Sequence, residues 1–222
     1  MTTRGNEIAD NLATVNSRIA SAAKLANRSV DEITLIAVTK TFPASDIEIL
    51  YELGVRNFGE NRDQEGSVKA PQLPDDAIWH FQGQIQSNKL KSISAWADVV
   101  HSIDQLSHAQ KLDSLGVTKD IFLQVGLDQS ENRGGAQPGE LLDLVESVSS
   151  LSNLRILGLM AVAPLGELPE KAFERLSEIS KNLVSIHPGM SAISAGMSND
   201  FEAAIAYGAT HIRIGSQILG VR

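Results

Sequence analysis

Lys40 is the residue of this sequence with the clearest reactive chemistry. It follows an apolar, β-branched run at residues 33–38, which indicates a buried strand. At the end of such a strand an ammonium group is partly shielded from water, which favours the free amine. A free lysine amine attacks a carbonyl carbon and forms a Schiff base. From its position alone, a solvated lysine at a strand end fits this residue equally well.

Small and hydroxyl-bearing residues form a second candidate group near the end of the chain. They occupy positions 194–198 and 215–216, each directly after a predicted strand. Small residues let backbone N–H groups approach a phosphate, and serine hydroxyls add further donors. Arg213 comes two residues before Gly215, so both face the same side of a regular strand. The pattern predicts a phosphate site beside a guanidinium group, although such a segment can also be an ordinary turn.

The elements that must position these residues alternate between strands and helices. A helix is predicted from about residue 6 to about residue 27, where Ile8, Leu12, Val15 and Ile19 recur at helical spacing. The predicted strands are residues 33–38, 55–58, 77–81, 98–102, 121–127, 155–160, 190–194 and 211–215. Helical segments separate them, which favours parallel pairing.

Eight parallel strands are the number that closes a barrel. The sequence therefore predicts an α/β protein, a single-domain (β/α)8 TIM-type barrel with an extra N-terminal helix. We expect one domain over residues 1–222, with residues 1–30 packed on the barrel as that helix. A doubly wound open sheet is the alternative, and no G-x-G-x-x-G motif follows the first strand to support it.

Barrel closure brings the two candidate groups together. Reactive groups of such barrels lie at the carboxyl ends of the strands, and the eighth strand pairs with the first. Lys40 would then be a neighbour of the phosphate donors. An aldehyde that carries a phosphate fits both, and this describes pyridoxal 5'-phosphate (PLP) as well as the phosphosugar of a Schiff-base aldolase. Spacing alone leaves both ligands open.

The composition excludes several classes of function. The formal net charge is −8, so the broad positive field for binding nucleic acid is missing. No apolar run is long enough to span a membrane and no leader segment is evident, so a cytoplasmic protein is expected. There are no cysteines, and no pair of histidines has metal-ligand spacing, so no metal site is expected.

Seven segments, taken in order, resemble one known family. They are AVTKTFP, FGENRDQE, WHFQGQIQSNK, HSID, GLMAVAP, AGMSNDFEAAIAYGAT and IRIGSQILG. This series resembles the YggS/PROSC family, the pyridoxal phosphate homeostasis proteins, whose barrel is similar to the N-terminal domain of alanine racemase. The resemblance runs from about residue 33 to residue 222. It implies a PLP-binding protein that keeps intracellular PLP and amino-acid pools in balance.

The resemblance also implies roles for particular residues. Lys40 would hold PLP as a Schiff base, and Arg213 would stand near the polar rim of the cofactor. The implied phosphate donors lie among Ser194, Gly196, Met197, Ser198, Gly215 and Ser216.

Two further residues are predicted to bind the cofactor from their place at strands. Asn61 follows the second strand and could direct its amide to the ring or to the lysine, or it could be a helix N-cap. His80 lies on the third strand, where a hydrogen-bonded core histidine is more common than a general base.

We expect a cofactor-binding protein without catalytic turnover, so no catalytic residue is assigned. A compact PLP-dependent amino-acid racemase is the alternative, but racemisation needs an acid or base on each face of the substrate. The chain has only two tyrosines, Tyr51 and Tyr207, both on predicted helices, and it ends soon after the eighth strand. The expected partners are PLP and PLP-dependent enzymes as acceptors, with a monomer as the expected state.

Overall fold

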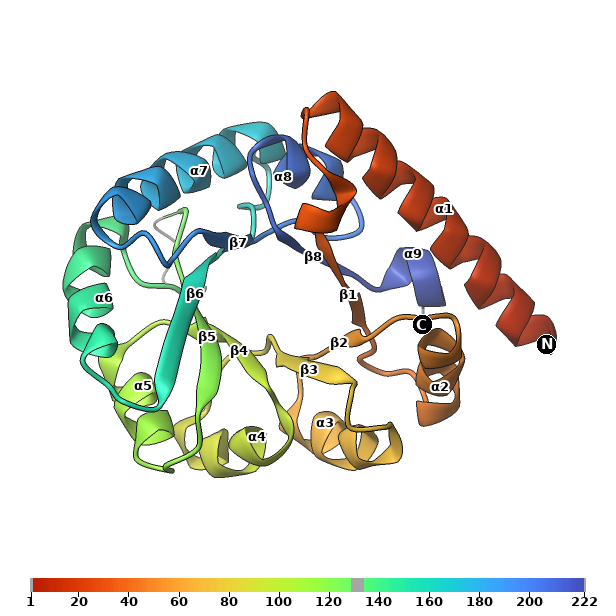
Figure 1. Ribbon diagram of the computed structural model, residues 1–222, viewed down its shortest axis with the longest axis horizontal. Helices are drawn as coiled ribbons and strands as arrows, with labels where there is room; N and C mark the ends of the chain where they lie inside the picture. The colour runs from red at the N-terminus through yellow and green to blue at the C-terminus, as the bar shows by residue number, and fades with distance from the viewer. Residues whose placement is uncertain (1, 129–133, 222) are drawn as a thin grey trace.

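The chain forms one closed parallel barrel. The computed structural model describes residues 2–128 and 134–221, and within them eight strands pair in chain order from β1 to β8 (Figure 1). The strands are β1 Thr34–Val38, β2 Asn57–Glu60, β3 Ile78–Phe81, β4 Val99–Ile103, β5 Lys119–Gln124, β6 Leu154–Met160, β7 Ala192–Ser194 and β8 His211–Ile214. β8 pairs in parallel with β1 and closes the ring. The prediction of a TIM-type barrel with an extra N-terminal helix is confirmed.

A helix follows every strand and lies on the outside of the barrel (Figure 1). The α-helices are α1 Thr3–Leu25, α2 Ala44–Glu52, α3 Asp63–Lys69, α4 Leu90–Trp96, α5 Leu106–Asp113, α6 Leu141–Ser149, α7 Pro169–Ile186, α8 Phe201–Ala206 and α9 Ser216–Leu219. Short 3-10 helices occupy Val30–Glu32, Ala70–Gln72, Ser87–Lys89 and Pro138–Glu140. The main hydrophobic core lies between the strands and this ring of helices.

The N-terminal helix α1 covers the place where the barrel closes. Its apolar face is buried, and it packs beside α2, α8 and α9 (Figure 1). Arg4 donates to the carbonyl of Leu219 at 2.8 Å, and Arg28 donates to the carbonyl of Ala209 at 2.7 Å. The helix begins earlier than predicted because the side chain of Thr2 caps it, accepting from the backbone N–H of Gly5.

The second strand lies two residues later than predicted, at 57–60 rather than 55–58. The cause is the end of α2. Gly54 adopts a φ of 94°, and the N–H of Val55 turns back to bond the carbonyl of Leu50. Val55 is therefore part of the C-terminal cap of α2 and cannot begin β2. The strand then continues to Glu60, whose neighbours pair with β1 and β3.

Gly158 provides a test of the barrel packing. A Cβ atom at this position in β6 would lie 1.8 Å from the carbonyl oxygen of Ala192 in β7, so the two strands must separate to accept it. Gly158→Ala is expected to cost more than about 3 kcal/mol of unfolding free energy, because overpacking against a main chain relaxes poorly. Chemical denaturation measures the change. Gly139→Ala is the control, since nothing lies within 4 Å of a Cβ there; equal stability of the two variants would contradict this packing.

Candidate functional site

A cavity of ≈ 690 Å³ opens at the carboxyl ends of the strands. The segments that line it follow β1, β2, β3, β6, β7 and β8. Seven of the predicted site residues meet there: Lys40, Asn61, Met197, Ser198, Arg213, Gly215 and Ser216. The structure thus brings the reactive lysine and most of the proposed phosphate donors to one cavity.

Lys40 stands on the cavity wall just beyond β1. Its side chain is exposed, so the expectation that the strand end shields it from water is wrong. The strand before it is only partly buried, because Ile36 and Ala37 are buried while its other residues are partly exposed. Asn61 also lines the cavity, and the alternative that it caps α3 is wrong, because Arg62 occupies the N-cap position.

The two serine hydroxyls of the predicted cradle are within reach of each other. The hydroxyl of Ser216 donates to that of Ser198 at 3.1 Å. Ser216 begins α9, and the first N–H groups of a helix have no partner within the helix. The loop that carries Ser198 is fixed by a hydrogen bond from the N–H of Met197 to Asp200 at 2.5 Å, and by one from Gln217 to the carbonyl of Ser198. The cavity therefore has a rigid wall of hydroxyl and N–H donors.

Two glycines make this wall possible. Gly196 adopts a φ of 90°, and a Cβ there would lie 2.7 Å from the Cβ of Ala204. A Cβ at Gly215 would lie 3.0 Å from the carbonyl oxygen of Val38. Gly196 does not itself line the cavity; it allows the turn that places Ser198.

Arg213 forms part of the floor of the cavity. It is buried, and its guanidinium donates to the carbonyl and the hydroxyl of Ser194 at 2.8 Å each and to the carbonyl of Ala161 at 3.0 Å. Burial lowers the pKa of Arg213 to about 10, and the nearby Asp200 opposes that change. The guanidinium is therefore still charged at neutral pH.

Ser194 and His80, both predicted to bind the cofactor, are not among the residues that line the cavity. Both belong to a buried chain of hydrogen bonds inside the barrel. Ser194 Oγ is 2.9 Å from His101 Nδ1, His101 Nε2 is 2.9 Å from His80 Nδ1, and His80 Nε2 is 2.9 Å from Asn57 Oδ1. The guanidinium of Arg213 at one end can only donate, and the amide oxygen of Asn57 at the other can only accept. Each group between them therefore accepts one hydrogen bond and donates the next.

The histidines inside the barrel are neutral. Burial lowers the pKa of His80 to about 3 and that of His101 well below its usual value. Burial also lowers the pKa of His211 to about 4. Ring contacts join these residues to Phe122, so they pack as part of the barrel interior. They hold the floor of the cavity in place and carry no charge at neutral pH.

Sequence analysis missed two features of the site. Gln82 lines the cavity, and its Nε2 is buried without a hydrogen-bond partner among the described residues.

Glu60 and Lys69 form a buried ion pair beside the loop of Lys40, with 2.7 Å between Lys69 Nζ and Glu60 Oε1. Burial raises the pKa of Glu60. A buried lysine and glutamate nine positions apart in different elements leave no periodic signal in the sequence.

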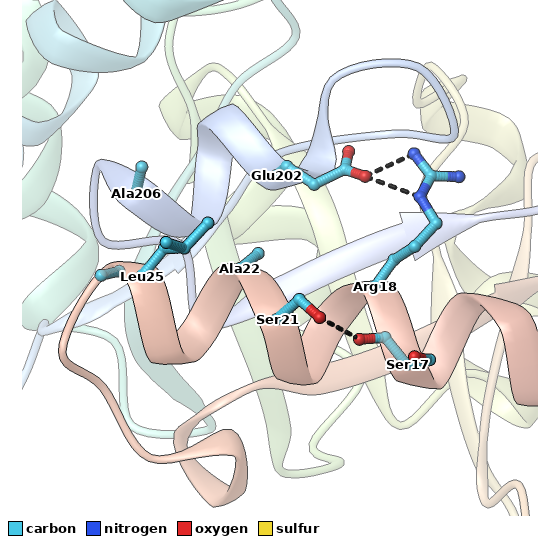
Figure 2. Close-up of a pocket in the computed structure, with 8 residues that line it drawn as sticks. Ser17, Arg18, Ser21, Ala22, Leu25, Glu202 and Ala206 are labelled. Atoms are coloured by element: carbon cyan, nitrogen blue, oxygen red, sulfur yellow. Dashed lines mark hydrogen bonds and ion pairs between the residues drawn. The ribbon is translucent and has the colours of Figure 1, made fainter.

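A smaller hollow of ≈ 290 Å³ lies outside the barrel, between α1 and α8. Figure 2 shows Arg18 of α1 directed at Glu202 of α8, with Ala22 and Leu25 farther along α1. Arg18 Nε donates to Glu202 at 2.7 Å, so this pair attaches α1 to the helix beneath it. The hollow contains none of the predicted site residues.

The described residues offer neither a membrane-spanning helix nor a metal site. Within residues 2–128 and 134–221, no helix is both long and apolar enough to cross a membrane. In the same part of the chain, no group of three acidic or histidine side chains could hold a metal ion.

The closed parallel barrel, with a cavity at the carboxyl ends of its strands, defines a (β/α)8 ligand-binding barrel. Residues 11–222 match the family described as alanine racemase, N-terminal domain. The pyridoxal phosphate homeostasis protein of Mycobacterium leprae is 38% identical, over 98% of this chain and 93% of its own length. That of Pseudomonas aeruginosa is 41% identical, over 97% of this chain and 96% of its own length.

A solved structure agrees with these relatives. PipY of Synechococcus elongatus, with PLP bound, is similar at a TM-score of 0.85 and 35% identity, covering 96% of this chain and all of PipY. The chain therefore belongs to the family of pyridoxal phosphate homeostasis proteins, as the resemblance predicted.

The neutral histidines predict a stability that depends on pH. Between about pH 4 and pH 6.5 the unfolded chain binds more protons than the folded one, so stability is full above pH 6.5 and falls as the pH decreases. Each such histidine contributes up to about 1.4 kcal/mol per pH unit. The raised pKa of Glu60 acts in the opposite direction.

His211→Gln isolates the contribution of one histidine. Denaturant unfolding at pH 7 and pH 5 is expected to show a smaller loss of stability for the variant than for the unaltered chain. The glutamine side chain takes up no proton, so the difference reports the titration of His211 together with its effect on the pKa of His80 and His101. Parallel pH profiles for the two proteins would mean that His211 titrates alike in the folded and unfolded states.

Proposed function

We propose that this chain binds PLP in the cavity at the strand ends and acts in PLP homeostasis and amino-acid balance. The observation that carries the proposal is that Lys40 shares one cavity with Ser198, Ser216 and Arg213. The cavity thus contains an amine that can react with the aldehyde of PLP and hydrogen-bond donors that can bind its phosphate. PipY, which is 35% identical, has been solved with PLP bound, and this supports the same ligand here.

The residues of the cavity fit the chemistry of PLP. Lys40 would hold the aldehyde carbon covalently, while the hydroxyls of Ser198 and Ser216 and the first N–H groups of α9 would receive the phosphate. At Gly215, β8 and β1 are in close contact, and a Cβ there would lie 3.0 Å from the carbonyl oxygen of Val38. The absence of a side chain also keeps the main chain at Gly215 accessible to a ligand. When bound, PLP supplies an electron-withdrawing ring next to the amine that it carries.

Asn61, Gln82 and Arg213 would contact the rest of the cofactor. Arg213 brings a positive charge to the cavity floor. The buried Nε2 of Gln82 is a donor with no partner among the described residues, and a polar ligand atom would satisfy it. Ser194 would act indirectly by holding Arg213, His80 by supporting Ser194 through His101, and Gly196 by shaping the turn before Ser198.

The proposed role is to store and release the cofactor rather than to turn over a substrate. Lys40 is exposed, so water or an incoming amine can reach a group that is bound to it. PLP-dependent enzymes are the proposed acceptors, and we propose that the chain acts as a monomer. The curated relatives are named homeostasis proteins, which supports this role.

A racemase would need a second acid or base across the ring from Lys40. Tyr51 donates to Asp76 outside the cavity, and Tyr207 ends α8. Neither tyrosine lines the cavity. Two carboxylates do line it, but Glu167 is paired with Arg175 and Asp200 accepts from the N–H of Met197, so this arrangement favours storage over racemisation.

Lys40→Ala is expected to abolish the covalent retention of PLP and to leave the barrel folded. Only the amine is removed, because the exposed side chain has no packing role and the phosphate donors stay in place. Borohydride reduction followed by peptide mass spectrometry checks this. Lys24→Ala, at an exposed site on α1, should keep the labelled peptide. A pyridoxyl group found on another lysine of the Lys40→Ala protein would show that Lys40 is misassigned.

The purified protein is expected not to racemise alanine at a useful rate. Loss of a positioned acid or base typically costs ~10²- to 10⁴-fold, so only trace exchange at the α-carbon is expected. Incorporation of deuterium into both enantiomers measures it. Exchange at ordinary enzyme rates, on the order of 10 per second, would favour a compact racemase over a storage protein.

A further inference from the structure

The main chain on both sides of Lys40 is tied to one turn of α3. Lys69 Nζ donates to the carbonyl of Thr39 at 2.9 Å, and the N–H of Thr41 donates to Glu65 Oε2 at 2.7 Å. Glu65 and Lys69 are themselves paired at 2.8 Å, one helical turn apart. We propose that Glu65 and Lys69 are positioning residues, which set where the amine of Lys40 stands in the cavity.

The anchor of this arrangement is buried. Lys69 Nζ also donates to Glu60 Oε1 at 2.7 Å, and the hydroxyl of Thr39 donates to the same oxygen at 2.6 Å. Glu60 is fully buried and Lys69 nearly so. A hydrogen-bonded ion pair that is shielded from water has little freedom to shift. The loop of Lys40 is therefore fixed to the barrel wall through Glu60 and to α3 through Lys69 and Glu65.

The backbone at Thr41 needs such support. Thr41 has a φ of 70°, a left-handed conformation that is unfavourable for a β-branched residue. Conformations of this kind persist only where the surroundings hold them. The bond from the N–H of Thr41 to Glu65 supplies that restraint directly after the reactive lysine. The N–H of Phe42 also bonds the carbonyl of Thr39 at 3.1 Å and closes the turn. Loss of the Glu65 bond would remove one restraint on Thr41 and let Lys40 shift from its place.

Lys40 depends on these main-chain bonds because its own side chain has no other restraint. No hydrogen bond or ion pair within residues 2–128 and 134–221 holds the Lys40 amine, which is exposed on the cavity wall. Its position is thus set by Thr39 and Thr41. The proposal rests on the proposed function, since it concerns the same lysine.

The first experiment compares the rate at which PLP attaches to Lys40 in variants of the cofactor-free protein. Glu65→Ala is expected to slow attachment by roughly ten- to a hundredfold, since a misplacement of about 1 Å costs that much. Glu65→Gln keeps an acceptor oxygen for the N–H of Thr41 and should lose less. Ser67→Ala, an exposed change on the same helix, is the control and should attach PLP at the unaltered rate.

A rescue separates positioning from simple stability. Glycine adopts the left-handed conformation without strain, so Thr41→Gly in the Glu65→Ala background should recover most of the lost rate. Binding of pyridoxamine 5'-phosphate, which has no aldehyde, should be unchanged throughout because the phosphate donors are intact. Lys69→Met should slow attachment in the same direction as Glu65→Ala.

A readout without cofactor keeps the two proposals distinct. Trace acetylation of the cofactor-free protein, mapped by mass spectrometry with Lys24 as the internal reference, should show altered labelling of Lys40 in Glu65→Ala. Failure of PLP and pyridoxamine 5'-phosphate to bind the unaltered chain would overturn the proposed function. The positioning role would still be supported by the altered labelling of Lys40. A lower unfolding temperature with unaltered attachment and labelling in Glu65→Ala, Glu65→Gln and Lys69→Met would overturn the positioning role. If Glu65→Ala does not fold, Glu65→Gln and Lys69→Met decide by the same two readouts.

Discussion

The pairing of β8 with β1 is the constraint on which the site depends. It aligns Ile36 with Arg213 and Ala37 with Ile214, so both strands end at the same rim of the barrel. Lys40 and Ser216 follow those ends and reach one cavity, although they lie at opposite ends of the sequence. In an open sheet with the same strands, they would stand at its two outer edges. α1 protects this closure, because Arg4 and Asn11 donate to the main-chain carbonyls of Leu219 and Ile218 and the helix packs against α8 and α9.

The barrel interior accommodates polar groups that a purely apolar core would exclude. A buried guanidinium is costly unless its donors are satisfied, and Arg213 meets three oxygen atoms. The hydroxyl of Ser194 then leads through His101 to His80, and the chain ends at an amide near the amino end of the barrel. Because the histidines are neutral, they add no repulsion to the positive charge of Arg213. This arrangement gives the cavity a rigid, charged floor at the depth of the strands.

Sequence reasoning brought to the cavity the residues that follow strand ends, together with Arg213 in β8, but it did not give the depth of His80 and Ser194 inside the barrel. Lys40, Ser198 and Ser216 were predictable because any residue just beyond a parallel strand of a barrel faces the same rim. His80 and Ser194 were misplaced because their depth depends on the register and tilt of the barrel, which periodicity does not report. The ion pair of Glu60 with Lys69 was also missed, since charged residues are expected on the surface and the packing of α3 against β2 and β3 buries them.

Two requirements meet at Lys40, and the structure separates them. A lysine that stores a cofactor reversibly must be open to water and to incoming amines, whereas a catalytic site gains from excluding water. Exposure of the side chain meets the first requirement, but an exposed lysine has many conformations and positions its amine poorly. Restraining the backbone rather than the side chain resolves the conflict. Lys69 holds Thr39, Glu65 holds Thr41, and the amine between them is left accessible. Under the proposed function, the restrained backbone of residues 39–41 and the accessible side chain of Lys40 therefore both serve reversible storage of the cofactor.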